Sequence, residues 1–298
     1  MLKRIYERLI RSRWEVGFVK GGLDGVFSDG PLMVDWVINP FRDRWFADPF
    51  ILDVTDNYIY VLAEEFRFKT KKGRIAKLFI NRQTLRIERF TILLELPVHL
   101  SFPNILREGD RVYVYPESCG NKNLCLYEYD KNNEKLVFSR VIADDAIWDS
   151  SITDFLGERC LFTARKDDYH LDVYAWNPRT ARFVYSYSIE SSRKDSRMAG
   201  QLFCYKGMIY CPTQDCTANY GGAVVIKRVG QDKDGIHLLP VLRMESPHRT
   251  RKTALHTLNE YKGVAVIDVG GYDFPHLGPA LHRLVRKRKK GKDENNSN

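Results

Sequence analysis

The chain has 298 residues, of which 44% are hydrophobic and 29% charged, and its formal net charge is +9. This globular composition excludes a disordered, collagen-like or disulfide-scaffold chain. Residues 1–20 carry six basic and two acidic groups, and residues 281–298 carry seven and two, so the two ends hold +4 and +5. The part between them is electrically balanced, which argues against a nucleic-acid partner bound across the fold.

The N-terminal segment, residues 1–13, is predicted to form a short amphipathic basic helix. Its apolar residues Leu2, Ile5 and Leu9 fall on one helical face. Two interpretations remain open: a helix packed on the domain, or a helix lying on an anionic lipid surface. The basic tail, residues 281–298, is predicted to be disordered and would assist the second interpretation, because polybasic segments are attracted to such surfaces.

Residues 14–280 show an all-β pattern, with short runs rich in β-branched and aromatic residues separated by Gly, Asn or Asp. The runs span residues 58–66, 74–80, 111–118, 123–129, 160–165, 171–176, 208–214, 223–229 and 264–269. No apolar stretch is long enough for a spanning helix, and the N-terminus lacks the apolar core of a signal peptide. The six cysteines are too sparse for a disulfide framework. We therefore expect a cytoplasmic protein with reduced thiols.

A five-fold internal repeat organises this central region. Segments 47–51, 101–105, 148–152, 198–202 and 254–258 are similar, and each is followed by a turn and a second strand. Their equivalent positions, which we call blade-start positions, are Asp48, Phe102, Asp149, Ala199 and Leu255, at spacings of 54, 47, 50 and 56 residues. Multi-stranded units of about 50 residues are typical of propeller blades. The sequence predicts a five-bladed β-propeller, with residues 14–20 completing the last blade. A β-sandwich would not explain the repeat.

Two blade-start positions are acidic, and this points to chemistry on the propeller axis. The first strands of a propeller line its centre, so Asp48 and Asp149, two blades apart, are expected to converge there. Paired carboxylates act as acid and base, or as nucleophile, in glycosidic chemistry. Glu64, Glu65 and Glu117 end neighbouring second strands. The alternative for each acid is an ordinary turn or solvated strand-end residue.

The motif at residues 46–50, together with the repeat, resembles the five-bladed propellers of glycoside hydrolase family 43 and its relatives. The resemblance implies that Asp48 acts as base and that Asp149 orients substrate and tunes pKa. The family places its general acid, a glutamate, at the start of blade four, where residues 197–201 contain no carboxylate. Glu117 is then the candidate acid, with Glu65 as the runner-up, and whether the chain is an enzyme stays open.

A closer resemblance is to the propeller module beside the transferase domain of plant glucosamine inositolphosphorylceramide transferases. It rests on segments 46–50, 102–106, 115–118, 149–151, 197–200 and 214–221, and it covers residues 40–275. It implies a carbohydrate-active, glycoside hydrolase-like propeller that acts on a glycan or glycolipid intermediate. The alternative is a non-catalytic glycan-binding module that assists a glycosyltransferase. A peripheral position on the inner face of the membrane would suit either function.

The residues expected to line the site share a place at blade starts or in adjacent loops. The catalytic set is Asp48, Glu117 and Asp149, and the substrate-binding set is Glu65, His99, Asn104, Arg197, Gln214, Tyr220 and His256. Arg197 is expected either to pair with Asp149 or to bind an anionic group. The resemblance to family 43 suggests a central calcium near His256, whereas a hydrogen-bonded core histidine is the simpler alternative. No other cofactor or metal is expected.

Overall fold

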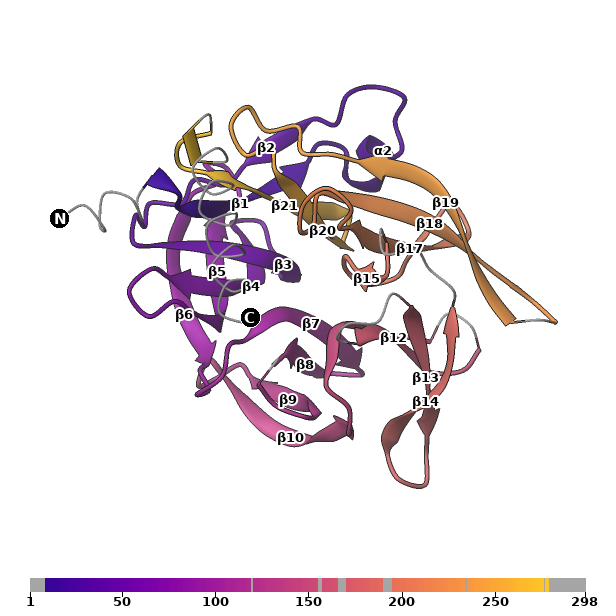
Figure 1. Ribbon diagram of the computed structural model, residues 1–298. Helices are drawn as coiled ribbons and strands as arrows, with labels where there is room; N and C mark the ends of the chain where they lie inside the picture. Colours follow the sequence, from indigo (N-terminus) through magenta and orange to yellow (C-terminus); the bar gives the residue numbers. More distant parts are fainter. Residues whose placement is uncertain are drawn as a thin grey trace, which may run out of the picture.

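The computed structural model describes residues 9–118, 120–154, 157–165, 170–189, 195–233, 235–275 and 277–278. The described strands form five antiparallel sheets around a central axis, so the predicted five-bladed β-propeller is confirmed (Figure 1). Figure 1 shows β3, β7, β15 and β20 near the centre and β6, β10, β14 and β19 at the rim. Within the described residues, no helix is long and apolar enough to cross a membrane.

The first three blades follow the chain without interruption. Blade one contains β3 (Arg44–Val54), β4 (Tyr58–Arg67), β5 (Lys72–Asn81) and β6 (Ile87–Leu94). Blade two contains β7 (Ser101–Glu108), β8 (Arg111–Glu117), β9 (Leu124–Asp130) and β10 (Lys135–Ala143). Blade three contains β11 (Ile147–Thr153), β12 (Cys160–Arg165), β13 (Leu171–Asn177) and β14 (Arg182–Ile189).

The last two blades differ in how they are assembled. Blade four contains β15 (Arg197–Met198), β17 (Met208–Asp215), β18 (Ala223–Asp232) and β19 (Gly235–Met244), and β16 (Phe203–Tyr205) also pairs with β17. Blade five contains β20 (Ala254–Tyr261), β21 (Val264–Tyr272), β1 (Ser12–Val19) and β2 (Val34–Trp36). A short helix, α2 (Gly22–Val26), follows β1.

The ring closes because β1, from the N-terminal part of the chain, supplies the third strand of the last blade. It pairs antiparallel with β21 from Ser12 opposite Tyr272 to Val19 opposite Ala265. The predicted closure by residues 14–20 is confirmed. The predicted helix reached Arg13, but Ser12 and Arg13 pair with β21 and are strand. Residues 1–8 and 281–298 lie outside the described residues, so the helix and tail predictions remain predictions.

Three blade starts share an unusual backbone conformation. Asp48, Phe102 and Asp149 have φ values of 49°, 45° and 46°, in the left-handed region that non-glycine residues rarely adopt. The pairing of the first and second strands is shifted at each of these points. A bulge of this kind turns a side chain away from the regular alternation of the strand. At these three blade starts, the sequence repeat therefore corresponds to a repeated backbone conformation.

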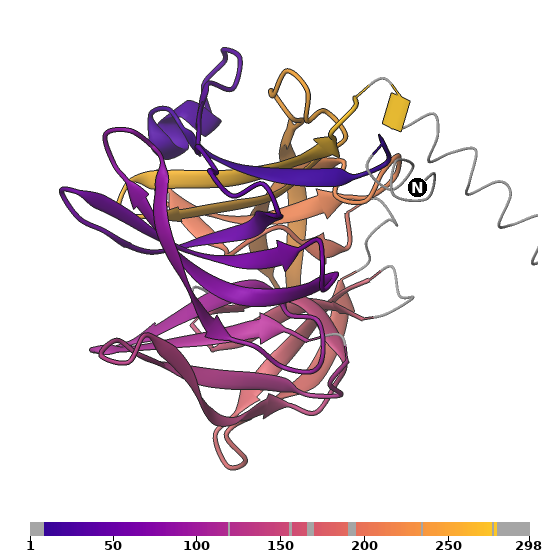
Figure 2. The same ribbon diagram turned by 90° about the vertical axis from the view of Figure 1, so that its left-hand side faces the viewer.

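The blades are held together by apolar side chains between their faces. One buried cluster includes Phe50, Phe102 and Phe162, which come from blades one, two and three. Burying a side chain of this size contributes about 1.5–3 kcal/mol. Figure 2 shows these blades following one another around the ring from the side. This packing fixes the blade starts relative to one another.

Candidate functional site at the propeller axis

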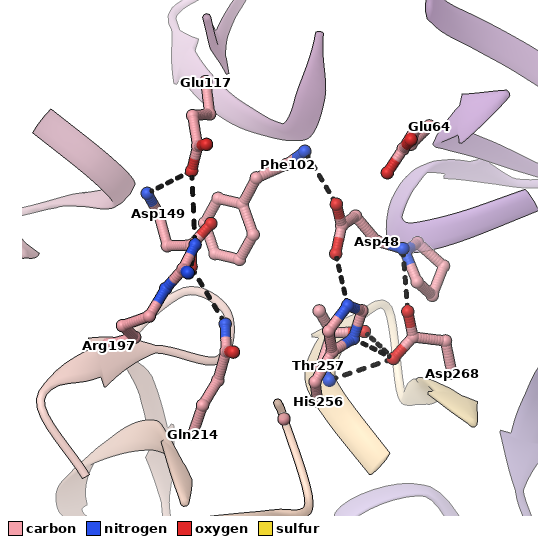
Figure 3. Close-up of polar contacts among 12 residues, drawn as sticks. Asp48, Glu64, Phe102, Glu117, Asp149, Arg197, Gln214, His256, Thr257 and Asp268 are labelled. Atoms are coloured by element: carbon pink, nitrogen blue, oxygen red, sulfur yellow. Dashed lines mark hydrogen bonds and ion pairs between the residues drawn. The ribbon is translucent and has the colours of Figure 1, made fainter. Parts of the chain in front are cut away.

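Eight polar side chains, drawn from all five blades, form what we call the axial cluster. The cluster consists of Asp48, Glu64, Glu117, Asp149, Arg197, Gln214, His256 and Asp268 (Figure 3). Seven of the eight are buried, with 6% exposure or less, and the side chain of Arg197 is 18% exposed. Buried charged groups need hydrogen-bonded partners, and the contacts below show two such networks.

The first network joins blades one and five through Asp48. The Asp48 carboxylate accepts a hydrogen bond from the backbone N–H of Phe102 at 3.0 Å and lies 3.4 Å from Nε2 of His256. Nδ1 of His256 lies 2.8 Å from the Asp268 carboxylate. Asp268 also accepts a hydrogen bond from the backbone N–H of Asp48 at 2.8 Å and from both the N–H and the hydroxyl of Thr257. His256 is thus held between two carboxyl groups.

Two groups of the first network, Asp48 and His256, have raised pKa values. Burial raises the pKa of Asp48 to about 8, with His256 acting in the opposite direction and Asp268 adding to the increase. Burial opposes a charge on His256, but Asp268 and Asp48 outweigh it and raise the pKa of His256 to about 9. Both groups therefore hold a proton more readily than they would in solution.

The second network is centred on the guanidinium of Arg197, which contacts two carboxyl groups. Nε and Nη2 of Arg197 lie 2.7 and 2.6 Å from Oδ2 of Asp149, and Nη2 is 3.6 Å from Glu117. Glu117 accepts a hydrogen bond from the backbone N–H of Asp149 at 3.0 Å. Burial disfavours the charge on Arg197, but Asp149 and Glu117 help to keep its pKa well above the ordinary value. The guanidinium therefore gives both acids a charged hydrogen-bonding group inside the buried cluster.

Gln214 and two aromatic rings complete the second network. The side-chain amide of Gln214 donates to Asp149 at 3.0 Å and to the carbonyl of Met198 at 2.7 Å. The Arg197 guanidinium lies 4.9 Å from the ring centroid of Trp148 and 5.1 Å from that of Tyr220. Tyr220, one of the predicted substrate-binding residues, is 56% exposed, so this side of the second network reaches solvent.

Glu64 is a site residue that sequence reasoning passed over in favour of Glu65. In the strand register, Glu64 lies opposite Ala47 and Glu117 lies opposite Ser101, each one residue before a blade-start position. The two glutamates are therefore equivalent in blades one and two. Aligning residues 59–64 with 112–117 would have identified Glu64. Burial raises the pKa of Glu64, and the nearby imidazole of His99 acts in the opposite direction.

Two predicted substrate-binding residues have their polar atoms engaged within the protein. Glu65 has no exposed surface, and its carboxylate oxygens lie 2.7 Å from Arg44 and 2.9 Å from Arg74. Asn104 is also fully buried; it donates to the carbonyl of Ser150 and accepts from the N–H of Ile105. Glu65 stabilises blade one and Asn104 links blades two and three, so neither belongs to the axial cluster.

The other substrate-binding predictions fall at or beside the cluster. Arg197, Gln214 and His256 are members, and Tyr220 contacts the rings or charges of two of them. His99 lies next to Glu64, 3.2 Å from its carboxyl group, and keeps 39% of its side chain exposed. Asp268 was not predicted, because the second strand of blade five continues its apolar pattern on both sides of it.

Asp48, His256 and Asp268 are the described residues whose arrangement most resembles a metal site. One ligand atom from each lies within 4.8 Å of the others. These atoms contact one another directly, and Asp268 also accepts three hydrogen bonds from Asp48 and Thr257. Calcium prefers six to eight oxygen ligands, whereas the two carboxyl groups here already engage the imidazole between them. The group is organised as a hydrogen-bonded network and does not fit the calcium suggested by the resemblance.

A cavity of about 370 Å³ lies where blades five and one meet. Its walls include Arg13, Trp14, Asn39 and Arg251. Trp14 also stacks on His256, with ring centroids 3.9 Å apart. Trp14 therefore lines the cavity and also contacts a member of the axial cluster.

The fold and the axial cluster define a class: five-bladed β-propellers with buried carboxyl groups at and beside the blade starts. Residues 36–253 match the family described as glucosamine inositolphosphorylceramide transferase 1, N-terminal, and the chain belongs to that family. The glucosamine inositolphosphorylceramide transferases 1 of Oryza sativa subsp. japonica and Arabidopsis thaliana are each 26% identical, over 199 and 200 residues. These alignments cover 63% and 62% of this chain but 27% and 26% of the plant proteins, so the chain spans about a quarter of their length.

Solved structures show the same fold at low sequence identity. A GH43_1 enzyme from Xanthomonas citri complexed with xylotriose has a TM-score of 0.54 at 11% identity, covering 77% of this chain and 88% of that one. An exo-beta-1,3-galactanase from Clostridium thermocellum has a TM-score of 0.51 at 13% identity, covering 74% of this chain and 53% of that one. These similarities support the predicted propeller fold.

Proposed function

We propose that this protein is a carbohydrate-active propeller that binds the sugar part of a glycan or glycolipid at the axial cluster and carries out acid–base chemistry there. The observation that supports it most directly is the division of the cluster into two sets of carboxyl groups with different partners, one around His256 and one around Arg197. Asp48 and Glu64 are buried carboxyl groups with raised pKa, whereas Asp149 and Glu117 lie against the Arg197 guanidinium. Environments that separate the proton affinities of paired carboxyl groups are typical of acid–base sites.

The proposed roles follow from this division and reverse those implied by the resemblance. Asp48 or Glu64, in neutral form, would give a proton to the oxygen that leaves the sugar. Asp149, in carboxylate form, would stabilise positive charge that develops on the sugar ring. Glu117 shares the arginine with Asp149 and is the weaker candidate for the acid, because a guanidinium lies 3.6 Å from its carboxyl group.

Sugar binding itself has support from the rim of the cluster. Tyr220 and Trp148 offer aromatic faces of the kind that stack on sugar rings, and His99 offers a partly exposed imidazole. The cavity beside Trp14 is a place where further sugar units or an attached group could extend. A protein that acts on a short, branched or lipid-linked glycan would use both regions.

The test is a screen of nitrophenyl glycosides and nucleotide sugars with the wild type, Asp48→Asn and Glu64→Gln. The proposal expects turnover of at least one compound and a loss of about 10²-fold or more in each variant, the contribution typical of a positioned acid or base. Asp53→Asn, which changes an acid of blade one that is 46% exposed, is the matched control and should behave as wild type. Equal turnover by all four proteins would contradict the proposal.

A second candidate is a non-catalytic glycan-binding module that assists a glycosyltransferase. Two observations favour it: Ala199 stands at the start of blade four, and Arg197 engages both Asp149 and Glu117. The chain also matches only about a quarter of relatives that are named transferases. Calorimetric glycan binding by the wild type, retained in Asp48→Asn, with no turnover of any compound, would favour this candidate.

We also propose a peripheral position on an anionic membrane surface on the cytoplasmic side. Arg11 accepts a hydrogen bond from the backbone of Asp273 at 2.9 Å, so the two terminal segments leave the ring at neighbouring points. Their positive charge, +3 for residues 1–11 and +5 for residues 281–298, would then act on one surface. Co-sedimentation with phosphatidylserine vesicles should fall when residues 1–8 and 281–298 are removed, a truncation that leaves β1 intact. Undiminished binding by the truncated protein would contradict this proposal.

A further inference from the structure

Basic side chains gather on one face of the ring, the face at which the first strand of each blade begins. The turn between β4 and β5 lies on this face, and so do the loops that precede β1, β3 and β20. Five exposed or half-exposed residues of this turn and these loops form what we call the basic face: Arg42, Arg67, Lys69, Arg249 and Lys252.

Contacts around Arg13, at the start of β1, join these segments into one surface. The Arg13 guanidinium lies 4.8 Å from the ring centroid of Phe68, in the turn between β4 and β5. Its Nη2 donates a hydrogen bond to the carbonyl of Arg42 at 2.8 Å. Arg13 and Arg251 both pair with Asp273, which follows β21. The turn and the loops before β3 and β20 therefore adjoin one another.

Most of the positive charge on the basic face is uncompensated. Four of its five members form no salt bridge with any described residue: Arg42, Lys69, Arg249 and Lys252. Asp43, the exposed acid among them, already pairs with Arg44 and Arg67. Each lysine or arginine held near an anionic membrane contributes about fivefold in affinity. The basic face is thus complementary in charge to such a membrane.

Exposed apolar side chains lie among these basic groups. Ile38, which lines the cavity beside Arg13, is 49% exposed, and Phe274, which follows Asp273, is 38% exposed. Such side chains can enter the boundary between lipid headgroups and acyl chains, whereas a soluble anion gives them no apolar environment. The combination of unpaired positive charge and exposed apolar groups favours a membrane as the partner of this face.

The axial cluster opens on the same side of the ring. Tyr220, which is 56% exposed and lies beside Arg197, belongs to the loop between the end of β17 and the start of β18. The carbonyl of Gly221 accepts a hydrogen bond from the N–H of Leu255, near the start of β20, at 2.9 Å. A surface that contacts the basic face would therefore also face Tyr220.

We propose that the basic face docks on a membrane containing anionic lipids and turns the axial cluster toward the bilayer, where the sugar of a membrane-bound glycolipid can reach it. The use of that sugar rests on the proposed function, whereas the docking does not. The basic face belongs to the folded ring and acts in addition to the terminal segments. Asp144 and Asp145 are exposed on the same side, in the loop before β11, so the contact is tilted toward blades five and one.

The first test compares two triple variants of the full chain that lose the same charge. One changes the basic face: Arg42→Gln, Lys69→Gln and Lys252→Gln. The other changes exposed turns at the opposite ends of the strands: Lys131→Gln, Arg179→Gln and Lys233→Gln. Affinity for vesicles of phosphatidylserine and phosphatidylcholine in equal parts should fall about 10²-fold in the first variant and less than about threefold in the second. Equal losses, or no loss in the first variant, would overturn the proposal.

A second comparison separates a membrane from a soluble polyanion. Ile38→Ser should weaken vesicle binding about fivefold, because an apolar contact is lost, without changing retention on heparin. Leu239→Ser, at 50% exposure on β19, is the matched control and should change neither. Unchanged vesicle binding by Ile38→Ser, with heparin retention lost in the basic-face variant, would identify a soluble polyanion as the partner and overturn the membrane assignment.

Hydrogen exchange of the wild type, with and without the same vesicles, tests the orientation. The amides of residues 67–72 and 216–222 should exchange more slowly on vesicles, whereas those of residues 131–134 and 178–181, at the opposite ends of the strands, should not change. Slower exchange in the second pair of segments, or no change in the first, would overturn the orientation.

The outcomes separate this inference from the proposed function. Vesicle binding is measured without any glycan, so it reports on docking alone. If docking follows the expected pattern while no glycan is bound or turned over, the proposed function fails and the docking stands. If glycan turnover depends on Asp48 while the two triple variants bind vesicles equally, the docking fails and the proposed function stands.

Discussion

The carboxylate of Asp268 in blade five accepts a hydrogen bond from the backbone N–H of Asp48 in blade one, at 2.8 Å. The two residues are 220 positions apart in sequence, and the bond crosses the junction at which the ring closes. The same carboxylate contacts His256 and Thr257. One side chain therefore holds both the junction and the imidazole beside Asp48 in place.

Replacing Asp268 should destabilise the whole protein. Asp268→Ala leaves the N–H of Asp48 and the donors of Thr257 without their acceptor and His256 without its closest carboxylate. Breaking a buried charged pair costs about 3–5 kcal/mol, and urea unfolding should show a loss in this range. Asp53→Ala, at an exposed ion pair with Lys262, should change stability by no more than about 0.5 kcal/mol. A loss below 1 kcal/mol in Asp268→Ala would contradict the assignment.

Stability should fall as pH rises through the alkaline range. Asp48 and His256 both have folded-state pKa values above their ordinary values, at about 8 and about 9, so the folded state binds more protons than the unfolded chain. The resulting stabilisation is complete below the unfolded-state pKa values and is lost as pH rises through 8 and 9. Each excess proton gives a slope of about 1.4 kcal/mol per pH unit.

The measurement is the free energy of unfolding in urea at intervals between pH 6.5 and 9. In His256→Gln one of the two proton-binding groups is absent, so the decrease with pH should be shallower than in the wild type. A profile that is flat or rises over this range would show that the two groups are not protonated in the folded protein.

We expect Arg197 to stabilise the folded protein mainly by compensating the charges of the buried carboxyl groups beside it. Arg197→Met retains much of the apolar stem between Trp148 and Tyr220 but leaves Asp149 and Glu117 buried without a cation. We expect a loss of about 3–5 kcal/mol at neutral pH, measured by denaturant unfolding. Adding Asp149→Asn to this variant should recover part of the loss, because one buried charge is removed.

The matched control for Arg197 is Arg243→Met. Arg243 pairs with Asp215 and Glu245 but is 47% exposed, so its removal should cost less than about 1 kcal/mol. Equal effects of the two arginine variants would mean that the pairing at the axis is no stronger than a surface ion pair.

Gly73→Ala tests the close packing around Glu64. The added methyl group would overlap Leu100, Glu64 and His99, and overpacking of this kind costs about 1–3 kcal/mol. Gly30→Ala is the control, since nothing lies within 4 Å of a Cβ atom there. The thermal midpoints of the two variants should differ by roughly 2–4 °C for each kcal/mol of difference. If Gly73→Ala is as stable as Gly30→Ala, the loop around His99 shifts to accommodate the added methyl group at little cost.

The fold could be predicted because its repeat is visible in short segments of the sequence. Each blade start lies at the beginning of an apolar strand and is followed by a turn and a second strand, so spacing alone identifies five units. The closing strand was also predictable, since a ring of five similar units leaves residues 14–20 without another partner. The short helix α2 was not predicted, because five residues are too few for a helical period to show.

The site was predictable only in part because its contacts depend on which way a strand faces. Glu64 and Glu65 are adjacent in sequence, yet one meets His99 near the axis and the other meets Arg44 and Arg74. The register shift between Ala47 and Phe50 helps to set these faces, and a shift of this kind has no reliable signature in sequence. Asp268 was missed because it lies inside an apolar strand pattern and because its partner Asp48 is 220 positions away in sequence.

The closure of blade five also constrains how the protein reaches its native state. The pairing of Ser12 with Tyr272 and of Val19 with Ala265 joins parts of the chain about 250 residues apart. Such non-local contacts slow folding, because the entropy of closing a long loop is lost before the contacts form. Blades one to four are contiguous in sequence and can assemble in the order of synthesis, whereas the last blade must recruit a strand that was made first. Until the C-terminal strands emerge, β1 exposes an unpaired edge, so this strand is the segment of a nascent chain most in need of protection from aggregation.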